Sequence, residues 1–315
     1  MLGERIKFTL MPNRSLSYLK IMQQMKKIVG LGEALWDVLP EGKQIGGAPI
    51  NFAYHAMQFG HEAYAVSAVG KDDLGKELCE RLEAKGIRLA IPAIDFPTGT
   101  VDVCLSEGGV PVYSINLGAA WDNIPYIPEM KSIARSTDAV CFGTLAQRSE
   151  TSRNTIYGFL DDMPDGENKF KVFDINLRQE FYSADNIAQS LQRSNVLKLN
   201  DEELPIAAAL FDVPSNDYEK ACTRLAERFG LRYVILTCGT HGSYVFANGS
   251  KSFIETPIVE VVDTVGAGDA FSGAFVGSLL NGETMSDAHI KAVRTSAYVC
   301  KCHGAMPDMR HLRLA

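Results

Sequence analysis

The sequence predicts an α/β protein with a doubly wound, mainly parallel sheet, helices on both faces of the sheet and a small β lid. A chain of 315 residues with 46% hydrophobic residues can bury a large core. From residue 25 onward, segments with strand periodicity alternate with segments of helical periodicity. Such alternation is typical of parallel sheets covered by helices on both faces. One segment, residues 98–118, departs from it.

The N-terminal half opens with two strand–helix units. The first predicted strand is "KIVGLGEALWDVL", followed by the helix "PINFAYHAMQFG", which ends at Gly60. The second unit combines the strand "AYAVSAVG" with the helix "DLGKELCERLEAKG", which ends at Gly86. Glycine just after a periodic segment predicts a helix end, because it readily adopts the left-handed conformation found there.

The second half continues the alternation. Further strands are predicted at "DAVCFG", "KFKVFDI", "NVLKLN" and "YVILTC". Helical periodicity appears near residues 150–162, 184–193 and 217–229, and another helix is expected to begin near Gly268. These elements are expected to extend the same sheet.

The segment from Thr98 to Gly118, "TGTVDVCLSEGGVPVYSINLG", alternates with period two around an "EGG" turn. This pattern predicts a hairpin with no helix after it. Inserted into a doubly wound core, the hairpin is a candidate lid. No repeat or linker divides the remaining chain, so residues 25–315 are expected to form one domain.

Residues 1–24 need a separate interpretation. They are basic and mixed in character and lack the apolar run of a signal peptide. The stretch that follows, "MKKIVGLGEALWDVLP", resembles the opening of an α/β protein. We therefore expect Met25 to be the functional start and residues 1–24 to be a dispensable extension; the alternative is an additional amphipathic helix packed on the fold.

Composition excludes several partners. The net charge is -7, the isoelectric point is near 5.5, and no basic stripe is present, which argues against nucleic acid and anionic membrane. The sequence contains no run of about 18 apolar residues, so no membrane span is predicted. The seven cysteines are an odd number scattered along the chain, as expected of reduced thiols in a cytoplasmic enzyme.

The stretch "VVDTVGAGDAFSGAF" predicts an anion site. Its helix begins near Gly268, so the first turn comprises Gly266 to Asp269. Free N–H groups and the helix dipole attract an anion there, and small residues let a phosphate approach closely. The alternative is that Asp269 only complements the dipole as an ordinary first-turn acid. These residues alone do not decide between the two.

Polar or glycine-rich stretches follow the other predicted strands, where ligands bind in open α/β sheets. In "FDINLR", period two places Asp174, Asn176 and Arg178 on one side. In "KLNDEEL", Asn200 and Glu203 are either ligand-binding residues or a helix cap. The remaining candidates are Thr237, Gly239 and Gly242 of "LTCGTHGS", which can equally form a turn, Gly46, Gly47 and Asn51 of "IGGAPINFA", and Asp37.

Two nucleotide-binding motifs are rejected. The stretch "GKDDLGKE" lacks the Ser or Thr of a P-loop, because Glu77 stands in its place. The "GAGDAFSG" stretch lacks the third glycine of a dinucleotide fingerprint, because Phe271 occupies that position. A dehydrogenase is therefore not expected.

Taken together, these stretches resemble the ribokinase-like sugar kinases, often called the PfkB family. The resemblance runs from about Lys26 to Pro307 and is most specific in "GGAPINFAYHAMQFGHEAYAVSAVGKDDLG" and "DTVGAGDAFSGAF". It implies a ribokinase-like fold and transfer of the γ-phosphoryl group of ATP, with Mg²⁺, to a sugar hydroxyl. It also implies a lid at residues 98–118 that closes over the sugar, and a homodimer formed through the lid.

The resemblance assigns roles to the candidate residues. Asp269 looks like the catalytic base, and Gly266, Ala267, Gly268 and the Asp269 amide look like its anion hole. Asn200 and Glu203 would organise Mg²⁺ and the phosphates, while Thr237, Gly239 and Gly242 would lie along the nucleotide. Sugar hydroxyls would be held by Asp37, Gly46, Gly47 and Asn51, with Arg178 near the phosphates or the sugar. Asp263 would be a ligand of a monovalent cation such as K⁺.

Within the family, "GEALWD", "GGAPINFA" and "GAAWDNIP" look most like fructokinases, which implies conversion of D-fructose to fructose 6-phosphate. A 2-keto-3-deoxygluconate kinase is the alternative, because Arg178 can pair with a substrate carboxylate. A ribokinase comes next. A sugar- or nucleotide-binding regulator without catalytic activity is the alternative from a different class, and the intact "GAGD" stretch argues for an active kinase.

Overall fold

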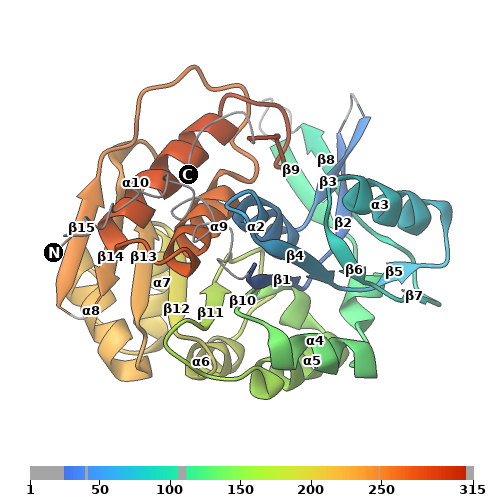
Figure 1. The fold of residues 1–315 in the computed structure, drawn as a ribbon, viewed down its shortest axis with the longest axis horizontal. Coiled ribbons are helices and arrows are strands. Elements are labelled where there is room, and N and C mark those ends of the chain that lie inside the picture. Colours follow the sequence, from blue (N-terminus) through green and yellow to red (C-terminus); the bar gives the residue numbers. More distant parts are fainter. Residues whose placement is uncertain (1–24, 40–41, 106–110, 248, 310–315) are drawn as a thin grey trace, which may run out of the picture.

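The computed structural model describes residues 25–39, 42–105, 111–247 and 249–309. The expectations for residues 1–24 and for the "EGG" turn of the hairpin lie outside this range. Figure 1 shows a layered α/β arrangement in which helices cover a central sheet.

In the described residues the central sheet has nine strands, in the order β15-β14-β13-β12-β11-β10-β1-β4-β6. The strands from β13 to β6 are parallel, and β14 and β15 extend the sheet as an antiparallel edge. The direction of winding reverses between β1 and β10, where open α/β sheets bind ligands. The strand bounds are β1 Lys27–Leu31, β4 Glu62–Val66, β6 Arg88–Ala90, β10 Ala139–Gly143, β11 Phe170–Asp174, β12 Val196–Asn200, β13 Tyr233–Thr237, β14 Ser243–Ala247 and β15 Ser250–Ile254.

Two apolar cores sandwich this sheet. Successive residues of one strand enter opposite cores, as with Ile28 and Val29 of β1. One face is covered by α4 Pro128–Ser136, α5 Glu150–Asp162, α6 Ala184–Gln192, α7 Glu203–Leu210 and α8 Tyr218–Phe229. The other is covered by α2 Ala48–Met57, α3 Asp73–Ala84, α9 Ala267–Leu280 and α10 Met285–Val299. This arrangement confirms the predicted fold class (Figure 1).

A second sheet has the order β3-β2-β8-β9, with bounds β2 Leu35–Leu39, β3 Gly42–Gly46, β8 Gly99–Leu105 and β9 Pro111–Ile115. The predicted hairpin is present as β8 and β9. However, the prediction of one strand over residues 27–39 is wrong: β1 lies in the central sheet, and β2 pairs with β8. The chain turns between them at Gly32, whose φ of 148° is readily adopted only by glycine.

The short strands β5 Val69–Gly70 and β7 Ala93–Ile94 pair separately, next to the start of α3. Asp72 caps this helix, accepting a hydrogen bond from Gly75 N at 2.7 Å. Glu77 forms an ion pair with Arg81 one turn later at 2.6 Å. The "GKDDLGKE" stretch is therefore a capped helix start with a charged outer face, as predicted.

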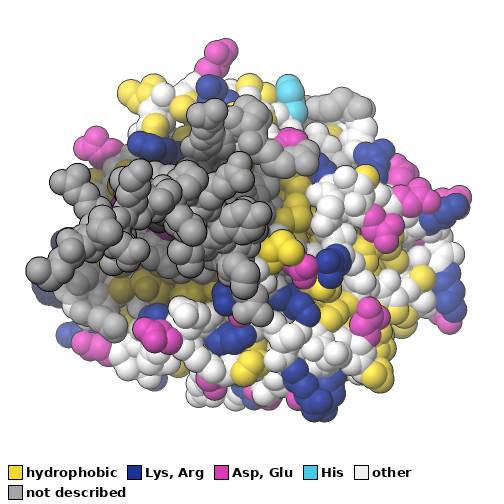
Figure 2. All heavy atoms as spheres, in the orientation of Figure 1, with side chains coloured by type: hydrophobic (Ala, Val, Ile, Leu, Met, Phe, Trp, Pro, Cys, Tyr) yellow, Lys and Arg dark blue, Asp and Glu magenta, His cyan; other side chains and the backbone are white. Residues whose placement is uncertain are grey.

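The short helical turns are η1 Ala120–Asn123, η2 Leu145–Arg148 and η3 Gly239–His241. None of the helices in the described parts of the chain is both long enough and apolar enough to span a bilayer. On the face drawn in Figure 2, Lys and Arg side chains are interspersed with Asp and Glu.

Candidate active site

The carboxyl ends of the parallel strands bring distant parts of the sequence together. Glu33 follows β1, Asp174 ends β11, Asn200 ends β12 and Thr237 ends β13. The N-terminal turns of α2 and α9 meet at the same edge, because Asn51 Nδ2 donates a hydrogen bond to Asp269 Oδ2 at 2.8 Å. Two motifs 218 residues apart thus form one site.

Asp269 lies in the first turn of α9, as predicted. Burial raises the pKa of its carboxyl above the ordinary value, although the Asn51 hydrogen bond and the charges of Lys198 and Arg178 oppose the rise. A raised pKa makes the carboxylate a better proton acceptor. Its setting therefore fits a general base better than an exposed first-turn acid.

We call the main-chain turn Gly266–Asp269 the anion loop. Two of its positions, Gly266 and Gly268, leave little or no room for a side chain. Gly266 has a φ of 76°, and a Cβ atom there would lie 2.5 Å from Ala305 Cβ. A Cβ on Gly268 would lie 3.2 Å from Lys198 Nζ. The glycines therefore let Ala305 and the amino group of Lys198 pack closely against the loop, in addition to leaving space for an anion.

Lys198 is a site residue that the sequence analysis missed. It lies on β12 directly beside Asp174 of β11, so their side chains share a face of the sheet and form an ion pair at 3.1 Å. Burial opposes its charge, but the carboxylates of Asp174, Glu203 and Asp269 outweigh burial and raise the pKa of Lys198. The amine therefore stays protonated and adds positive charge beside the anion loop.

Glu33 is a second residue that the sequence analysis missed. Its side chain is buried, and Oε2 has no hydrogen-bond partner among the described residues. Burial, reinforced by the charge of Asp269, raises the pKa of Glu33 to about 7. Its only sequence signal was a lone acid in the apolar stretch "GLGEALW".

The raised pKa of Glu33 predicts a pH-dependent stability. Folded Glu33 releases its proton near pH 7 and unfolded Glu33 near pH 4.5, so stability is lost as pH rises between these values. The parent protein should therefore lose stability from pH 5 to pH 8 through this group, and Glu33→Gln should not. The free energy of unfolding of Glu33→Gln, relative to that of the parent, should thus be about 2 kcal/mol higher at pH 8 than at pH 5. Denaturant unfolding at both pH values measures this. Glu202→Gln, at an exposed position, is the control, and its stability should depend on pH as that of the parent does. The same pH dependence of stability in Glu33→Gln and in the parent would contradict the prediction.

The predicted sugar residues Asp37, Gly46 and Gly47 lie where the second sheet meets α2. A Cβ on Gly46 would lie 2.4 Å from Asp37 Oδ2, and Gly47, with a φ of 121°, precedes α2. Burial, with the negative charges of Asp269 and Asp263, raises the pKa of Asp37 to about 6. The acids are therefore near enough to affect one another.

Arg178 is exposed, and its charge lowers the pKa values of Glu33, Asp37 and Asp269 against the effect of burial. The expectation that Asp174, Asn176 and Arg178 share one side of a strand is wrong. The strand β11 ends at Asp174, and Asn176 has a φ of 37°, which breaks the period of two. Asp174 pairs with Lys198 instead.

Asn200 and Glu203 form a reciprocal cap. Asn200 Oδ1 accepts hydrogen bonds from the N–H groups of residues 202 and 203, and Glu203 Oε2 accepts from Asn200 N at 2.9 Å. Glu203 Oε1 also accepts from Leu177 N at 2.9 Å, which fixes the loop after β11. These side chains are therefore bonded to the main chain as a helix cap, and their predicted role in organising Mg²⁺ stays a prediction.

The turn after β13 holds the predicted nucleotide residues. Thr237 ends the strand, Gly239 begins η3 with a φ of 52°, and Gly242 follows η3 with a φ of 132°. Thr256 Oγ1 donates a hydrogen bond to Gly239 O at 2.6 Å. Glycine is needed for this backbone, whatever the turn binds.

Asp263 precedes the anion loop and bridges two segments. Its Oδ1 accepts from Val265 N at 2.9 Å, and its Oδ2 accepts from Gly304 N at 3.1 Å. The carboxylate therefore joins the loop to the C-terminal segment. Its predicted role as a ligand of a monovalent cation stays a prediction.

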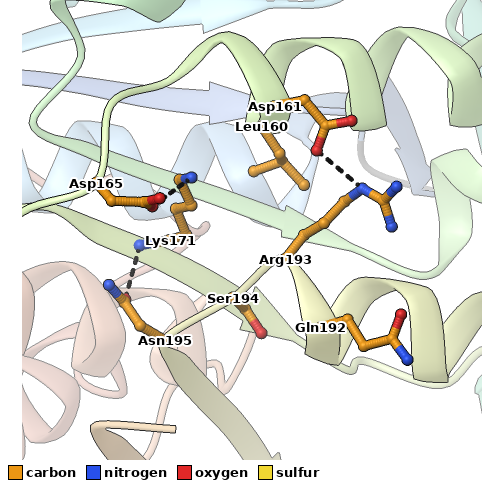
Figure 3. A pocket seen from close by; sticks show the side chains of 8 residues that line it. All are labelled: Leu160, Asp161, Asp165, Lys171, Gln192, Arg193, Ser194 and Asn195. Carbon is orange, nitrogen blue, oxygen red and sulfur yellow. Dashed lines mark hydrogen bonds and ion pairs between the residues drawn. The ribbon is translucent and has the colours of Figure 1, made fainter. Parts of the chain in front are cut away.

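A separate polar pocket of about 300 Å³ lies near the beginnings of β11 and β12, at the opposite ends of these strands from the candidate active site (Figure 3). Its ion pairs are Lys171 with Asp165 at 2.8 Å and Arg193 with Asp161 at 3.1 Å. The residues of the candidate active site do not line it.

The chain is similar to known proteins in both sequence and structure. The model of the pfkB family carbohydrate kinases matches residues 38–312. The chain is 29% identical over 280 residues to the ATP-dependent 6-phosphofructokinase of Thermoanaerobacterium thermosaccharolyticum, covering 85% of this chain and 82% of that protein. It is 26% identical over 288 residues to a fructokinase of Salmonella typhimurium, covering 87% and 91%. A structure from Escherichia coli in complex with ATP and Mg²⁺ is similar with a TM-score of 0.77 at 21% identity, covering 90% and 94%.

Proposed function

The chain belongs to the pfkB family of carbohydrate kinases, and from this premise we propose that it transfers the γ-phosphoryl group of ATP to D-fructose, giving fructose 6-phosphate. The observation that carries the proposal is the Asp269–Asn51 hydrogen bond at 2.8 Å, which joins the anion loop to the predicted sugar site. The carboxylate of Asp269, as the base for the attacking hydroxyl, then lies next to the anion loop, as the binding site for the transferring phosphoryl group.

Asp269 is proposed to accept the proton of the attacking hydroxyl. The sugar oxygen forms a bond to the γ-phosphorus while the bond from that phosphorus to the bridging oxygen breaks and ADP leaves. An alcohol is too weak an acid to ionise first, so its proton passes to the carboxylate as the new bond forms. The hydrogen bond from Asn51 orients the carboxylate for this step.

Phosphoryl transfer also needs positioning and neutralisation of charge. The N–H groups of the anion loop and the ammonium of Lys198 are proposed to meet the negative charge of the transferring group. Mg²⁺, when bound with ATP, neutralises charge on the phosphates, and Asn200 and Glu203 would hold its water ligands. Thr237, Gly239 and Gly242 are proposed to lie along the nucleotide.

The sugar site favours a neutral polyol. Asn51 Oδ1 and Glu33 Oε2 are buried without partners among the described residues, and Asp37 lies nearby. Such acceptors match hydroxyl donors, and ionised carboxylates repel an anionic sugar. D-Fructose satisfies these acceptors with hydroxyl groups alone.

Arg178 favours a second candidate, a sugar acid such as 2-keto-3-deoxygluconate. Its exposed guanidinium lowers the pKa values of Glu33 and Asp37 against the effect of burial. It can also form two parallel hydrogen bonds with a substrate carboxylate. We rank this candidate second because the charge of Arg178 is opposed by three carboxyl groups, those of Glu33, Asp37 and Asp269. The sheet of β2, β3, β8 and β9 is proposed to close over the sugar and to pair with the same sheet of a second copy.

A coupled assay of ADP release with ATP and Mg²⁺ tests the substrate. The panel contains D-fructose, fructose 6-phosphate, 2-keto-3-deoxygluconate, ribose, glucose and adenosine. We expect kcat/KM for D-fructose to exceed that for every other compound by at least about tenfold, the size of effect that a few polar contacts produce. Preference for the sugar acid would support the second candidate. Absence of turnover with every compound would contradict kinase activity and favour a binding protein.

A further inference from the structure

The last described residues of the chain, Gly304–Met309, form an irregular segment that we call the C-terminal strap. Ala305, Met306 and Met309 are buried. Lys85 Nζ donates a hydrogen bond to Met306 O at 3.0 Å. Side chains from other elements therefore hold the strap against the body of the protein.

The helix α2 supplies most of these bonds. Tyr54 OH donates to Pro307 O at 3.2 Å, and Gln58 Oε1 accepts from Met309 N at 2.6 Å. Between them in sequence, His55 Nε2 bonds to Ala305 O at 2.8 Å. Two residues of α2 and its C-cap residue thus fix the strap at alternate positions.

The strap in turn contacts the anion loop. Ala305 packs so closely on Gly266 that a Cβ atom on Gly266 would lie 2.5 Å from Ala305 Cβ, and Gly304 N donates a hydrogen bond to Asp263 just before the loop. Met309 packs in a small cluster with Ala270, the residue after Asp269. A shift of the strap would therefore be transmitted directly to the anion loop.

His55 is the most deeply buried of Tyr54, His55 and Gln58, the three residues that bind the strap from α2 and its C-terminal end. Its side chain is fully buried, and burial lowers its pKa to about 4, so the ring is neutral at physiological pH. Because its partner is a carbonyl oxygen, the ring proton must be on Nε2. Asn51, one helical turn earlier on the same face, donates to Asp269. The helix α2 thus contacts the catalytic carboxylate directly and the anion loop through the strap.

We propose that His55 is a positioning residue, which through Ala305 and the strap holds the N–H groups of the anion loop in line with the transferring phosphoryl group. The catalytic consequence rests on the proposed function. The structural part, that His55 orders the loop, stands independently of it.

Paired substitutions test the proposal. His55→Leu removes the donor at similar volume, whereas His55→Gln keeps a side-chain N–H that can reach Ala305 O. Displacing a reacting group by about 1 Å costs up to about 100-fold in rate. We expect His55→Leu to lower kcat by about tenfold or more with KM for ATP nearly unchanged, and His55→Gln to restore most of kcat. Amide hydrogen exchange at residues 264–269 should accelerate in the leucine variant only.

His61→Leu is the matched control. His61 is also a buried imidazole bonded to a main-chain carbonyl, Gly277 O at 2.9 Å, but it contacts α9 eight residues, or about 12 Å, beyond Asp269. We expect this variant to lose stability while keeping kcat and normal exchange at residues 264–269.

Equal kcat and equal loop exchange in His55→Leu and His61→Leu would overturn the proposal. The exchange measurement needs no substrate, so it decides the structural part even if the parent protein phosphorylates no sugar. If His55→Leu does not fold, Gln58→Leu replaces it, because the half-buried Gln58 also binds the strap. Its loop exchange should rise, and unchanged exchange would overturn the proposal.

Discussion

Asp269→Asn is expected to lower kcat by about 10² to 10⁴, the usual contribution of a general base. Asparagine keeps the size and can keep the hydrogen-bonding geometry toward Asn51, but it cannot accept the proton of the sugar hydroxyl. Because the ground-state contacts persist, KM for the sugar should change little. Steady-state kinetics over a range of sugar concentrations measures both constants.

Asp287→Asn is the control for the competing interpretation of Asp269 as a dipole-complementing acid. Asp287 also lies in a first helical turn, that of α10, and bonds to the cap residue Thr284 at 2.7 Å. Both substitutions weaken a helix start by up to about 1 kcal/mol. Only Asp269→Asn should lower kcat. Equal, near-parental kcat values in both variants would show that Asp269 is an ordinary first-turn acid.

Lys198→Met is expected to have the second large effect, with kcat lower by about 10² to 10³, as when one donor to the transition-state charge is lost. The substitution also leaves the buried carboxylate of Asp174 without its partner, which should destabilise the protein by about 3 to 5 kcal/mol. Activity and denaturant unfolding are measured on the same samples. The second variant Lys198→Met/Asp174→Asn separates the two effects, since removing both charges should restore much of the stability without restoring kcat.

Lys171→Met provides the matched control. Lys171 is a similarly buried lysine near the beginning of the neighbouring strand β11, paired with Asp165 at 2.8 Å in the pocket of Figure 3. It lies at the opposite edge of the sheet, about 10 Å along the strand from Asp174. We expect its loss to leave kcat unchanged. A double variant Lys198→Met/Asp174→Asn that regained kcat would contradict the proposed role of Lys198.

The fold was predictable because parallel strands and amphipathic helices repeat a simple pattern. The helix over residues 150–162 matches α5 residue for residue, and the helix of the "GAGD" stretch begins at Ala267, one residue before the expected start. The edge strands β14 and β15 were not predicted, although the "NG" dipeptide between them is a hairpin signal. The bend at Gly32 was also missed, because the apolar run continues across it.

The site was predictable only in part, and for a physical reason. Asp269 and Asn51 lie in local motifs with glycines and helix starts, so sequence alone marks them. Lys198 and Glu33 have no such context: Lys198 becomes notable only when strand register places it beside Asp174, and Glu33 only when the fold buries it. For Asn200 and Glu203, the capping geometry that competed with a ligand role is the one present.

Phosphorus NMR of the parent protein and Asp269→Asn, each incubated with ATP, Mg²⁺ and the best sugar of the panel, tests the central claim most directly. For the parent protein we predict that the γ-phosphate signal is replaced by one sugar phosphomonoester for each ADP formed, with little inorganic phosphate. Asp269→Asn should form neither product at a comparable rate. Inorganic phosphate alone from the parent protein, or sugar phosphate formed equally fast by Asp269→Asn, would contradict the proposal that this site transfers a phosphoryl group to a sugar with Asp269 as the base.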